Sequence, residues 1–62
     1  GSRMTRAELY RQHAHDAELR ARALADQAEA GDVGARQAAD AEAIAARVLG
    51  EIAQVEEEAE AA

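Results

Sequence analysis

Several residue types are absent from this chain of 62 residues or nearly so, and each absence excludes a class of structure. Cysteine is absent, so neither a disulfide nor a thiolate-bound metal can brace the fold. Proline is also absent, and Tyr10 is the single aromatic residue. A chain with so few aromatic and β-branched residues is a poor candidate for a β-sheet. No apolar run approaches the roughly 18 residues of a membrane-spanning helix, so we expect no membrane partner.

The chain is acidic, with a net charge of −6, and it contains no lysine. An acidic chain lacks the positive footprint that nonspecific nucleic-acid binding requires. Residues 1–3 are interpreted as a cloning remnant ahead of a native Met4. No apolar segment typical of a secretory signal is present, so we expect a cytoplasmic location. The segment 56–60 holds four glutamates at the end of a predicted helix, where the helix dipole disfavours them.

Abundant alanine, together with Glu, Arg, Leu and Gln, predicts helix along almost the whole chain. Thr5 and Glu8 have the spacing of a capping box, which starts a helix at Arg6. Gly31 suits the position after a helix C-cap, and Asp32 suits the N-cap of a following helix. We therefore predict a single all-α domain over 4–62, with a helix over 6–30, a turn over 31–34 and a helix over 35–60. So short a turn makes the two helices an antiparallel hairpin.

Alanine-rich heptad rows, with spacings of three and four residues, predict which side of each helix faces the other. We call the row that faces the partner helix the seam. In the first helix the predicted seam is Ala7, Tyr10, Ala14, Ala17, Ala21, Leu24 and Ala28. In the second helix it is Ala38, Ala41, Ala45, Val48, Ile52, Val55 and Ala59, with Ile44 and Leu49 flanking it.

Folding the chain about the turn pairs residues whose numbers add up to about 65. This register sets large side chains against alanine, and that complementarity of size supports the hairpin and a short distance between the helix axes. The predicted pairs are Leu24 with Ala41, Ala21 with Ile44, Ala17 with Val48, and Ala14 with Ile52.

The residues needed for catalysis or for holding a metal are not arranged to do either. His13 and His15 are two positions apart, so on a helix they point about 200° apart and cannot chelate one ion. Ser2 lies in the remnant and Thr5 is a helix cap, which leaves no nucleophile beside a base. We expect no enzyme activity, no metal and no cofactor.

Two helices of this size bury too little apolar surface to be stable alone, and chains without disulfides commonly solve this by oligomerisation. We therefore expect a homodimer that forms a four-helix bundle. The overall plan is similar to that of the Rop family of plasmid copy-control proteins, which are helical hairpins that dimerise in this way. Since Tyr10 lies in the predicted seam, the similarity carries over no functional residue.

The candidate interaction surface consists of leucines beside the seam and of a row of small residues on the second helix, opposite its predicted seam. These residues are Leu9, Leu19, Leu49, Ala39, Ala43, Ala46, Gly50 and Ala53. They favour a non-catalytic module for protein–protein interaction or homodimerisation, or an adaptor for another helical protein. The alternative is a small nucleic-acid-binding bundle that uses one of two sets on the first helix. The sets are Arg6, His13 and Arg20, or Arg11, His15 and Arg22.

Overall fold

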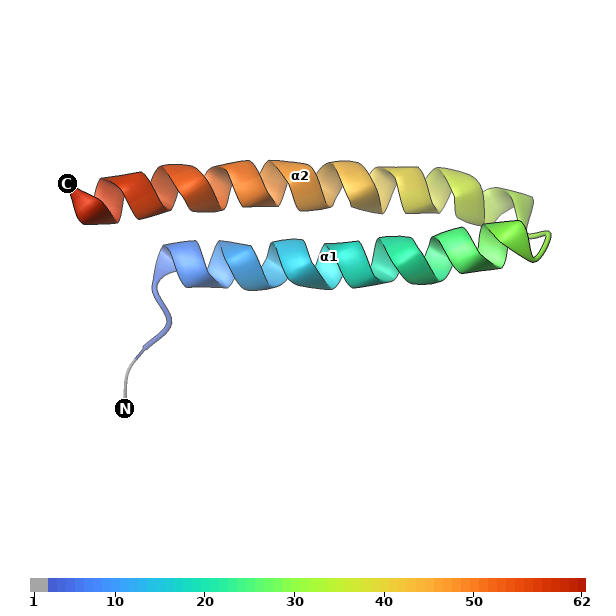
Figure 1. Cartoon of the computed structure of the whole chain (residues 1–62), viewed down its shortest axis with the longest axis horizontal. Coiled ribbons are helices and arrows are strands. Elements are labelled where there is room, and N and C mark those ends of the chain that lie inside the picture. Colours follow the sequence, from blue (N-terminus) through green and yellow to red (C-terminus); the bar gives the residue numbers. More distant parts are fainter. Residues whose placement is uncertain (1–2) are drawn as a thin grey trace.

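A computed structural model describes residues 3–62 and contains two α-helices, α1 (Arg6–Glu29) and α2 (Val33–Ala61). The helices run antiparallel, side by side along their whole length, and the start of α1 and the end of α2 lie at the same end of the hairpin (Figure 1). Its Cα atoms extend over 47 × 24 × 10 Å. The predicted all-α hairpin is confirmed, whereas its association into a four-helix bundle stays a prediction.

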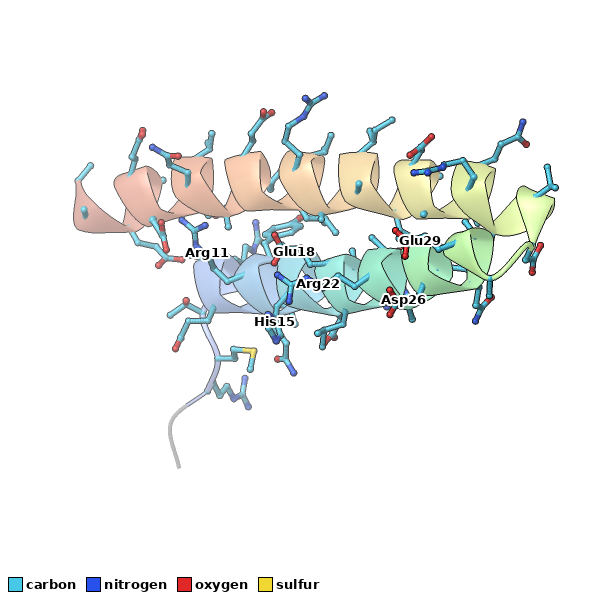
Figure 2. All side chains as sticks on the ribbon, turned by 45° about the vertical axis from the view of Figure 1, so that its right-hand side comes forward. Arg11, His15, Glu18, Arg22, Asp26 and Glu29 are labelled. Carbon is cyan, nitrogen blue, oxygen red and sulfur yellow. The ribbon has the colours of Figure 1, made fainter. Side chains whose placement is uncertain are left out.

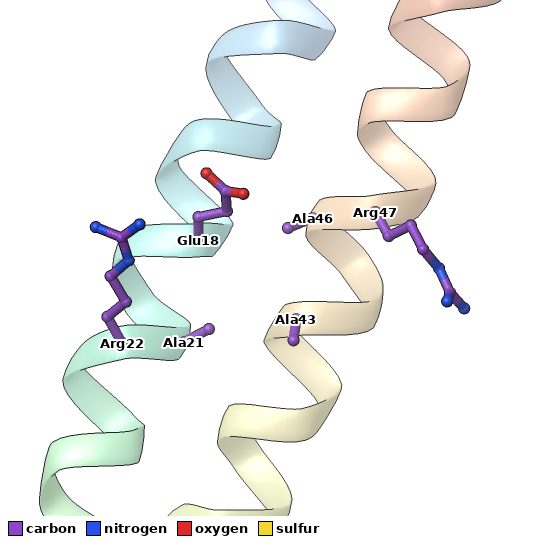
Figure 3. Close-up of a pocket in the computed structure, with 6 residues that line it drawn as sticks. All are labelled: Glu18, Ala21, Arg22, Ala43, Ala46 and Arg47. Atoms are coloured by element: carbon purple, nitrogen blue, oxygen red, sulfur yellow. The ribbon is translucent and has the colours of Figure 1, made fainter.

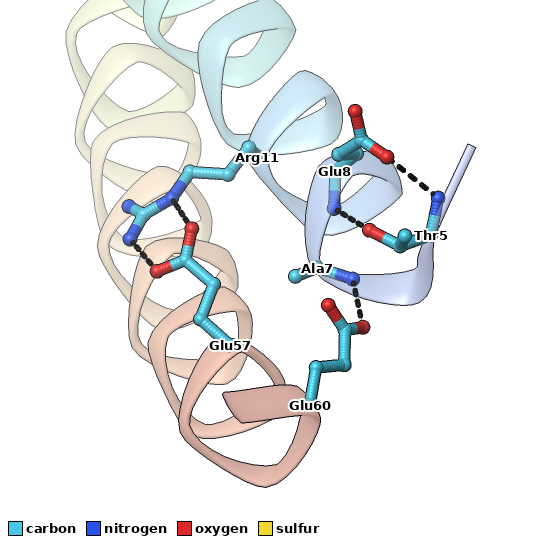
Figure 4. Close-up of polar contacts among 6 residues, drawn as sticks. All are labelled: Thr5, Ala7, Glu8, Arg11, Glu57 and Glu60. Carbon is cyan, nitrogen blue, oxygen red and sulfur yellow. Dashed lines mark hydrogen bonds and ion pairs between the residues drawn. The ribbon is translucent and has the colours of Figure 1, made fainter. Parts of the chain in front are cut away.

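The first turn of α1 is fixed by the predicted capping box. The Glu8 backbone N–H donates to the Thr5 hydroxyl oxygen at 3.1 Å, and the Thr5 N–H donates to the Glu8 carboxylate at 2.8 Å. The side chain of each residue therefore accepts the backbone N–H of the other at the exposed helix end. This capping box sets the start of α1 at Arg6 (Figure 4).

The turn between the helices is a Schellman motif, which satisfies the last free carbonyls of α1. The Asp32 N–H donates to the Gln27 carbonyl at 3.0 Å, and the Gly31 N–H donates to the Ala28 carbonyl at 3.1 Å. Gly31 has a φ of +114°, a conformation that glycine adopts without a Cβ clash. The Asp32 carboxylate then accepts the Ala35 N–H at 3.2 Å and caps α2, as the sequence predicted.

The helix bounds differ slightly from the prediction because the turn is tighter than expected. Helix α1 ends at Glu29 rather than residue 30, and α2 begins at Val33 rather than residue 35 and ends at Ala61 rather than residue 60. Val33 is the first helical residue of α2 and is 86% exposed. It therefore contributes little to the contact between the two helices.

The predicted seam of α1 is confirmed, since all seven of its residues are buried or half-buried. The predicted seam of α2 is wrong. The row that faces α1 is displaced by one residue, so that Ala41, Val48 and Val55 are exposed instead of covered. The observed seam of α2 has the same heptad spacing and consists of Ala35, Ala39, Glu42, Ala46, Leu49, Ala53 and Glu56.

This choice of seam makes the contact between the helices one of alanine against alanine. Over residues 3–62 the buried side chains are all alanines, namely Ala7, Ala17, Ala35, Ala39, Ala46 and Ala53. Since α1 presents mostly alanine, small residues on α2 allow the two backbones to approach closely and gain dispersion contacts. The large aliphatic residues of α2 are left at the edge of the contact or outside it.

The axial register of the hairpin agrees with the prediction. Three polar contacts join the helices, and the residue numbers of each pair add up to between 62 and 68. The predicted side-chain pairs, however, do not form as expected. Ala41, Ile44 and Val48 are exposed, so they do not cover their expected partners on α1, although Ile52 is half-buried. The three polar pairs are Ala7 with Glu60, Arg11 with Glu57, and Arg20 with Glu42.

Candidate interaction surface

Two ion pairs mark the two sides of the hairpin. Arg11 and Arg20 are nine positions apart, so they leave α1 about half a turn apart. Arg11 donates two hydrogen bonds to the Glu57 carboxylate, at 3.1 and 2.7 Å, while Arg20 donates to Glu42 at 2.9 Å. We call the side that carries Arg11 and Glu57 the polar side. The side that carries Arg20 and Glu42 is the aliphatic side.

On the polar side, α1 carries a continuous row of polar and charged residues. Figure 2 shows that these side chains follow one another along α1. Acids and bases are mixed along the row, which is typical of a solvated helix surface. The row consists of Arg11, His15, Glu18, Arg22, Asp26 and Glu29.

A shallow groove of about 400 Å³ lies between the helices on the polar side. Its inner surface is formed by Ala21, Ala43 and Ala46, and its rims carry Glu18, Arg22 and Arg47. The two arginine side chains extend outward from opposite rims and do not point toward a common centre (Figure 3). The groove therefore lacks the convergent polar groups that fix a small ligand in place.

On the aliphatic side, α2 carries an unbroken row of apolar residues that α1 covers only in part. Ile44 is 56% exposed, Val48 44% and Val55 65%. Ile52, Ala38 and Ala45 are half-buried, whereas Ala41 and Ala59 are exposed. We call this row the aliphatic stripe, and it consists of Ala38, Ala41, Ile44, Ala45, Val48, Ile52, Val55 and Ala59.

The aliphatic stripe is a second heptad row on the same helix. Apart from Ile44, its members have the three- and four-residue spacing of a helix that packs along another helix. Glu42 lies beside Ala38 and Ala45 on the helix surface, so the Arg20–Glu42 ion pair runs along the edge of the stripe. Helix α2 thus has one heptad row against α1 and a second, with larger side chains, that is open to solvent at Ala41, Val48, Val55 and Ala59.

The small-residue row predicted as a candidate surface is largely used inside the hairpin. Ala39, Ala46 and Ala53 are buried against α1, so the prediction that they lie opposite the seam is wrong. Ala43 is exposed on the groove, and Gly50 is half-buried. The cause is the one-residue displacement of the seam, which turns this row toward α1.

The three candidate leucines lie in different places. Leu49 belongs to the observed seam and is half-buried. Leu9 is 44% exposed and lies eleven positions before Arg20, a spacing that returns it to the aliphatic side. Leu19 is 50% exposed and lies two positions after the buried Ala17, so it points away from α2. Only Leu9 and Leu49 are therefore near the aliphatic stripe.

Sequence reasoning missed Ile44, Val48 and Val55 as exposed residues. The spacing of Val48 and Val55 predicts a contact with the first helix, whereas the structure leaves both residues exposed. The signal that could have separated the two rows is side-chain size, because a partner helix made mostly of alanine accommodates a row of small residues at the shortest distance.

The acidic end of α2 has partners at the start of α1, which the sequence reading also missed. The Glu60 carboxylate accepts the free Ala7 N–H at 3.4 Å, where the positive end of the α1 dipole favours an anion (Figure 4). Hydrogen bonds to Arg11 lower the pKa of Glu57, and the same contact raises the pKa of Arg11. Hydrogen bonding to Thr5, first of all from its backbone N–H to the Glu8 carboxylate and also from its side chain, likewise lowers the pKa of Glu8.

The residues of the two candidate nucleic-acid sets lie on both sides of α1, and each set contains an ion-paired arginine. Arg20 of the first set binds Glu42, and Arg11 of the second set binds Glu57. The second set also lies in the mixed row of Figure 2, together with the acids Glu18, Asp26 and Glu29. Both arrangements reduce the local positive charge available to a phosphate backbone.

Over residues 3–62, no three His, Asp or Glu side chains gather in a way that could hold a metal ion. Neither α1 nor α2 is long and apolar enough to cross a lipid bilayer. Comparison of the chain with protein-family models, with curated proteins and with solved structures gives no significant match.

Proposed function

We propose that this protein is a non-catalytic interaction module whose hairpin associates with a second copy to form a four-helix bundle. The observation that carries the proposal is the distribution of its apolar side chains. Among the described residues, alanine alone is buried, whereas Ile44, Val48 and Val55 are exposed on one side of α2. A hairpin arranged in this way has its interior contact filled by small residues and its main hydrophobic surface directed outward.

The exposed area supports the same proposal. The chain exposes 4695 Å², whereas a compact monomer of 6.6 kDa is expected to expose about 3,900 Å². The excess, roughly 800 Å², is about what each partner contributes to a standard protein–protein interface. A two-fold dimer hides such an excess most simply, since one patch covers its own copy.

Two ion pairs argue against nucleic-acid binding as a second candidate function. Arg11 and Arg20 each belong to one of the two sets that the nucleic-acid alternative uses, and both are bound to glutamates of α2. Together with the net charge of −6, this favours association between proteins over binding to nucleic acid.

Sedimentation equilibrium, with circular dichroism on the same samples, tests the proposal from low micromolar to millimolar protein. We expect a mass of twice 6.6 kDa at the upper concentrations. The melting temperature should rise with concentration, because folding and association are linked by mass action. A monomer that stays helical, with a melting temperature independent of concentration, would refute the proposal.

A further inference from the structure

We propose that the aliphatic stripe is the dimer contact, with α2 packed antiparallel against α2 of the second copy about a two-fold axis beside Val48. This inference rests on the proposed dimerisation and adds which surface is used, in which direction and in which register. The starting point is the second heptad row of α2, which has the spacing of a helix–helix contact and whose Ile44, Val48 and Val55 side chains are exposed.

The choice of side follows from the character of the two sides of the hairpin. The polar side carries the mixed row of charges on α1 and a groove with charged rims, and covering it would take many ionised groups out of water. On the aliphatic side, α2 presents only apolar residues along the stripe from 38 to 59, about 32 Å of helix. On that side α1 carries the exposed apolar Leu9 together with the exposed Arg6, His13 and Arg20.

The stripe is complementary to itself when its direction is reversed. Its two ends, Ala38 and Ala59, are equally distant from a point beside Val48, so an axis there gives the longest overlap. Residues of the two copies then face each other when their numbers add up to about 97. Val48 meets Val48 of the second copy, Ala45 faces Ile52 of the second copy, and Ala41 faces Val55 of the second copy. Ala41 and Ala45 are thus each opposite a large side chain, while Ala38 faces Ala59 at the two ends, which allows even packing over the middle of the contact.

The opposite, parallel direction has a worse arrangement of both size and charge. It would set Ile52 on Ile52 and Ala41 on Ala41, which alternates crowded and empty levels along the contact. It would also place the four glutamates of 56–60 beside the same four of the second copy. In the antiparallel register, Glu60 lies at the level of Arg36 of the second copy, so unlike charges and opposite helix ends come together.

Cysteine cross-linking tests the register directly, because the 62-residue chain has no cysteine of its own. A disulfide requires Cα atoms about 4.4–6.8 Å apart. Under mild oxidation, Val48→Cys should cross-link to itself. Ala41→Cys alone should not, since its two copies would be separated by about 21 Å along the axis. A mixture of Ala41→Cys and Val55→Cys should give the mixed disulfide.

Control variants on the polar side make the result specific. Ala43→Cys, which faces the groove, should remain unlinked. Val48→Glu should raise the dissociation constant at least about 100-fold, because it places two carboxylates without partners at the axis. Gln54→Glu adds the same charge at an exposed position of α2, eleven residues after Ala43 and therefore on the polar side, and should change the constant less than about threefold.

The outcomes separate this inference from the proposal on which it rests. Cross-linking of Val48→Cys together with the mixed pair supports the antiparallel stripe. Self-linking of Ala41→Cys would overturn the direction, and linking of Ala43→Cys would overturn the choice of side. A dimer by sedimentation that Val48→Glu leaves intact would move the interface elsewhere while dimerisation stands. A monomer at all concentrations would refute both.

Discussion

The sharpest test of the hairpin interior is to enlarge one of its alanines. Ala17 on α1 and Ala53 on α2 are both 0% exposed, so neither site has room for a larger side chain. Replacing either by leucine inserts three carbon atoms between two closely packed helices and forces them apart. Overpacking of this kind costs about 1–3 kcal/mol, and the difference in helix propensity between alanine and leucine is far smaller.

For a domain of this length, about 1 kcal/mol lowers the melting temperature by roughly 4–8 °C. We therefore expect Ala17→Leu and Ala53→Leu to melt roughly 5–20 °C lower than the natural chain. Ala43→Leu is the matched control, since it makes the same change at an exposed position of α2. All variants are melted by circular dichroism at one protein concentration, because association contributes to the midpoint.

The Ala53 variant decides between the two possible seams of α2. If the seam ran through Val48 and Val55, as the sequence predicted, Ala53 would point outward and its replacement by leucine would be harmless. An unchanged melting temperature for Ala53→Leu, or an equal loss for Ala43→Leu, would refute the alanine contact that the structure contains.

Further predictions concern the helix ends and the response to pH. Thr5→Ala removes the N-cap of α1 and should cost about 1 kcal/mol, with faster amide exchange at Glu8 as the readout. Gly31→Ala should cost about 1–3 kcal/mol because of its positive φ, whereas Gly50→Ala should gain about 0.5–1 kcal/mol, since its Cβ would enter open space within a helix; urea unfolding measures both. Because its arginine partner lowers the pKa of Glu57 in the folded chain, this carboxylate stabilises the fold above the usual glutamate pKa of about 4.3. That contribution is lost as the pH falls through the lowered pKa, so Glu57→Gln should reduce the acid sensitivity of unfolding; an identical pH profile would contradict the ion pair.

Local signals in the sequence were sufficient for the helix ends and for one of the two seams. The capping box of Thr5 and Glu8, the left-handed glycine at Gly31 and the cap at Asp32 each involve residues within a few positions of one another. Such contacts can be predicted from spacing alone. The seam of α1 was equally predictable, because this helix has one dominant apolar row.

The seam of α2 could not be chosen in the same way, because two heptad rows on that helix compete for it. Val48 and Ala46 lie on neighbouring rows, and both rows have the spacing of a helix contact. Hydrophobicity favours the row with the larger side chains, whereas the alanine surface of α1 favours the row that lets the backbones approach. For the same reason the predicted candidate surface is partly wrong, since its row of small residues contains the buried Ala39 and Ala53.

Contacts between the far ends of the chain were also beyond local reasoning. Glu57 and Glu60 belong to an acidic segment that, within its own helix, lies at the unfavourable end of the dipole. Only the antiparallel fold brings them to Arg11 and to the free Ala7 N–H of α1.

A contact made of alanine methyl groups has a mechanical consequence for the hairpin. Interdigitating leucine or isoleucine side chains resist sliding of one helix along another, and alanine side chains interdigitate much less. Axial shear between α1 and α2 is therefore opposed mainly by ties of another kind. The Schellman turn joins the helices at one end, and hydrogen bonds from Glu57 and Glu60 to α1 join them at the other. The Arg20–Glu42 ion pair links the helices between these two ends. Loss of the contacts of Glu57 and Glu60 would leave the helices connected mainly at the turn, so that α1 and α2 could shift along each other by a fraction of a helical turn.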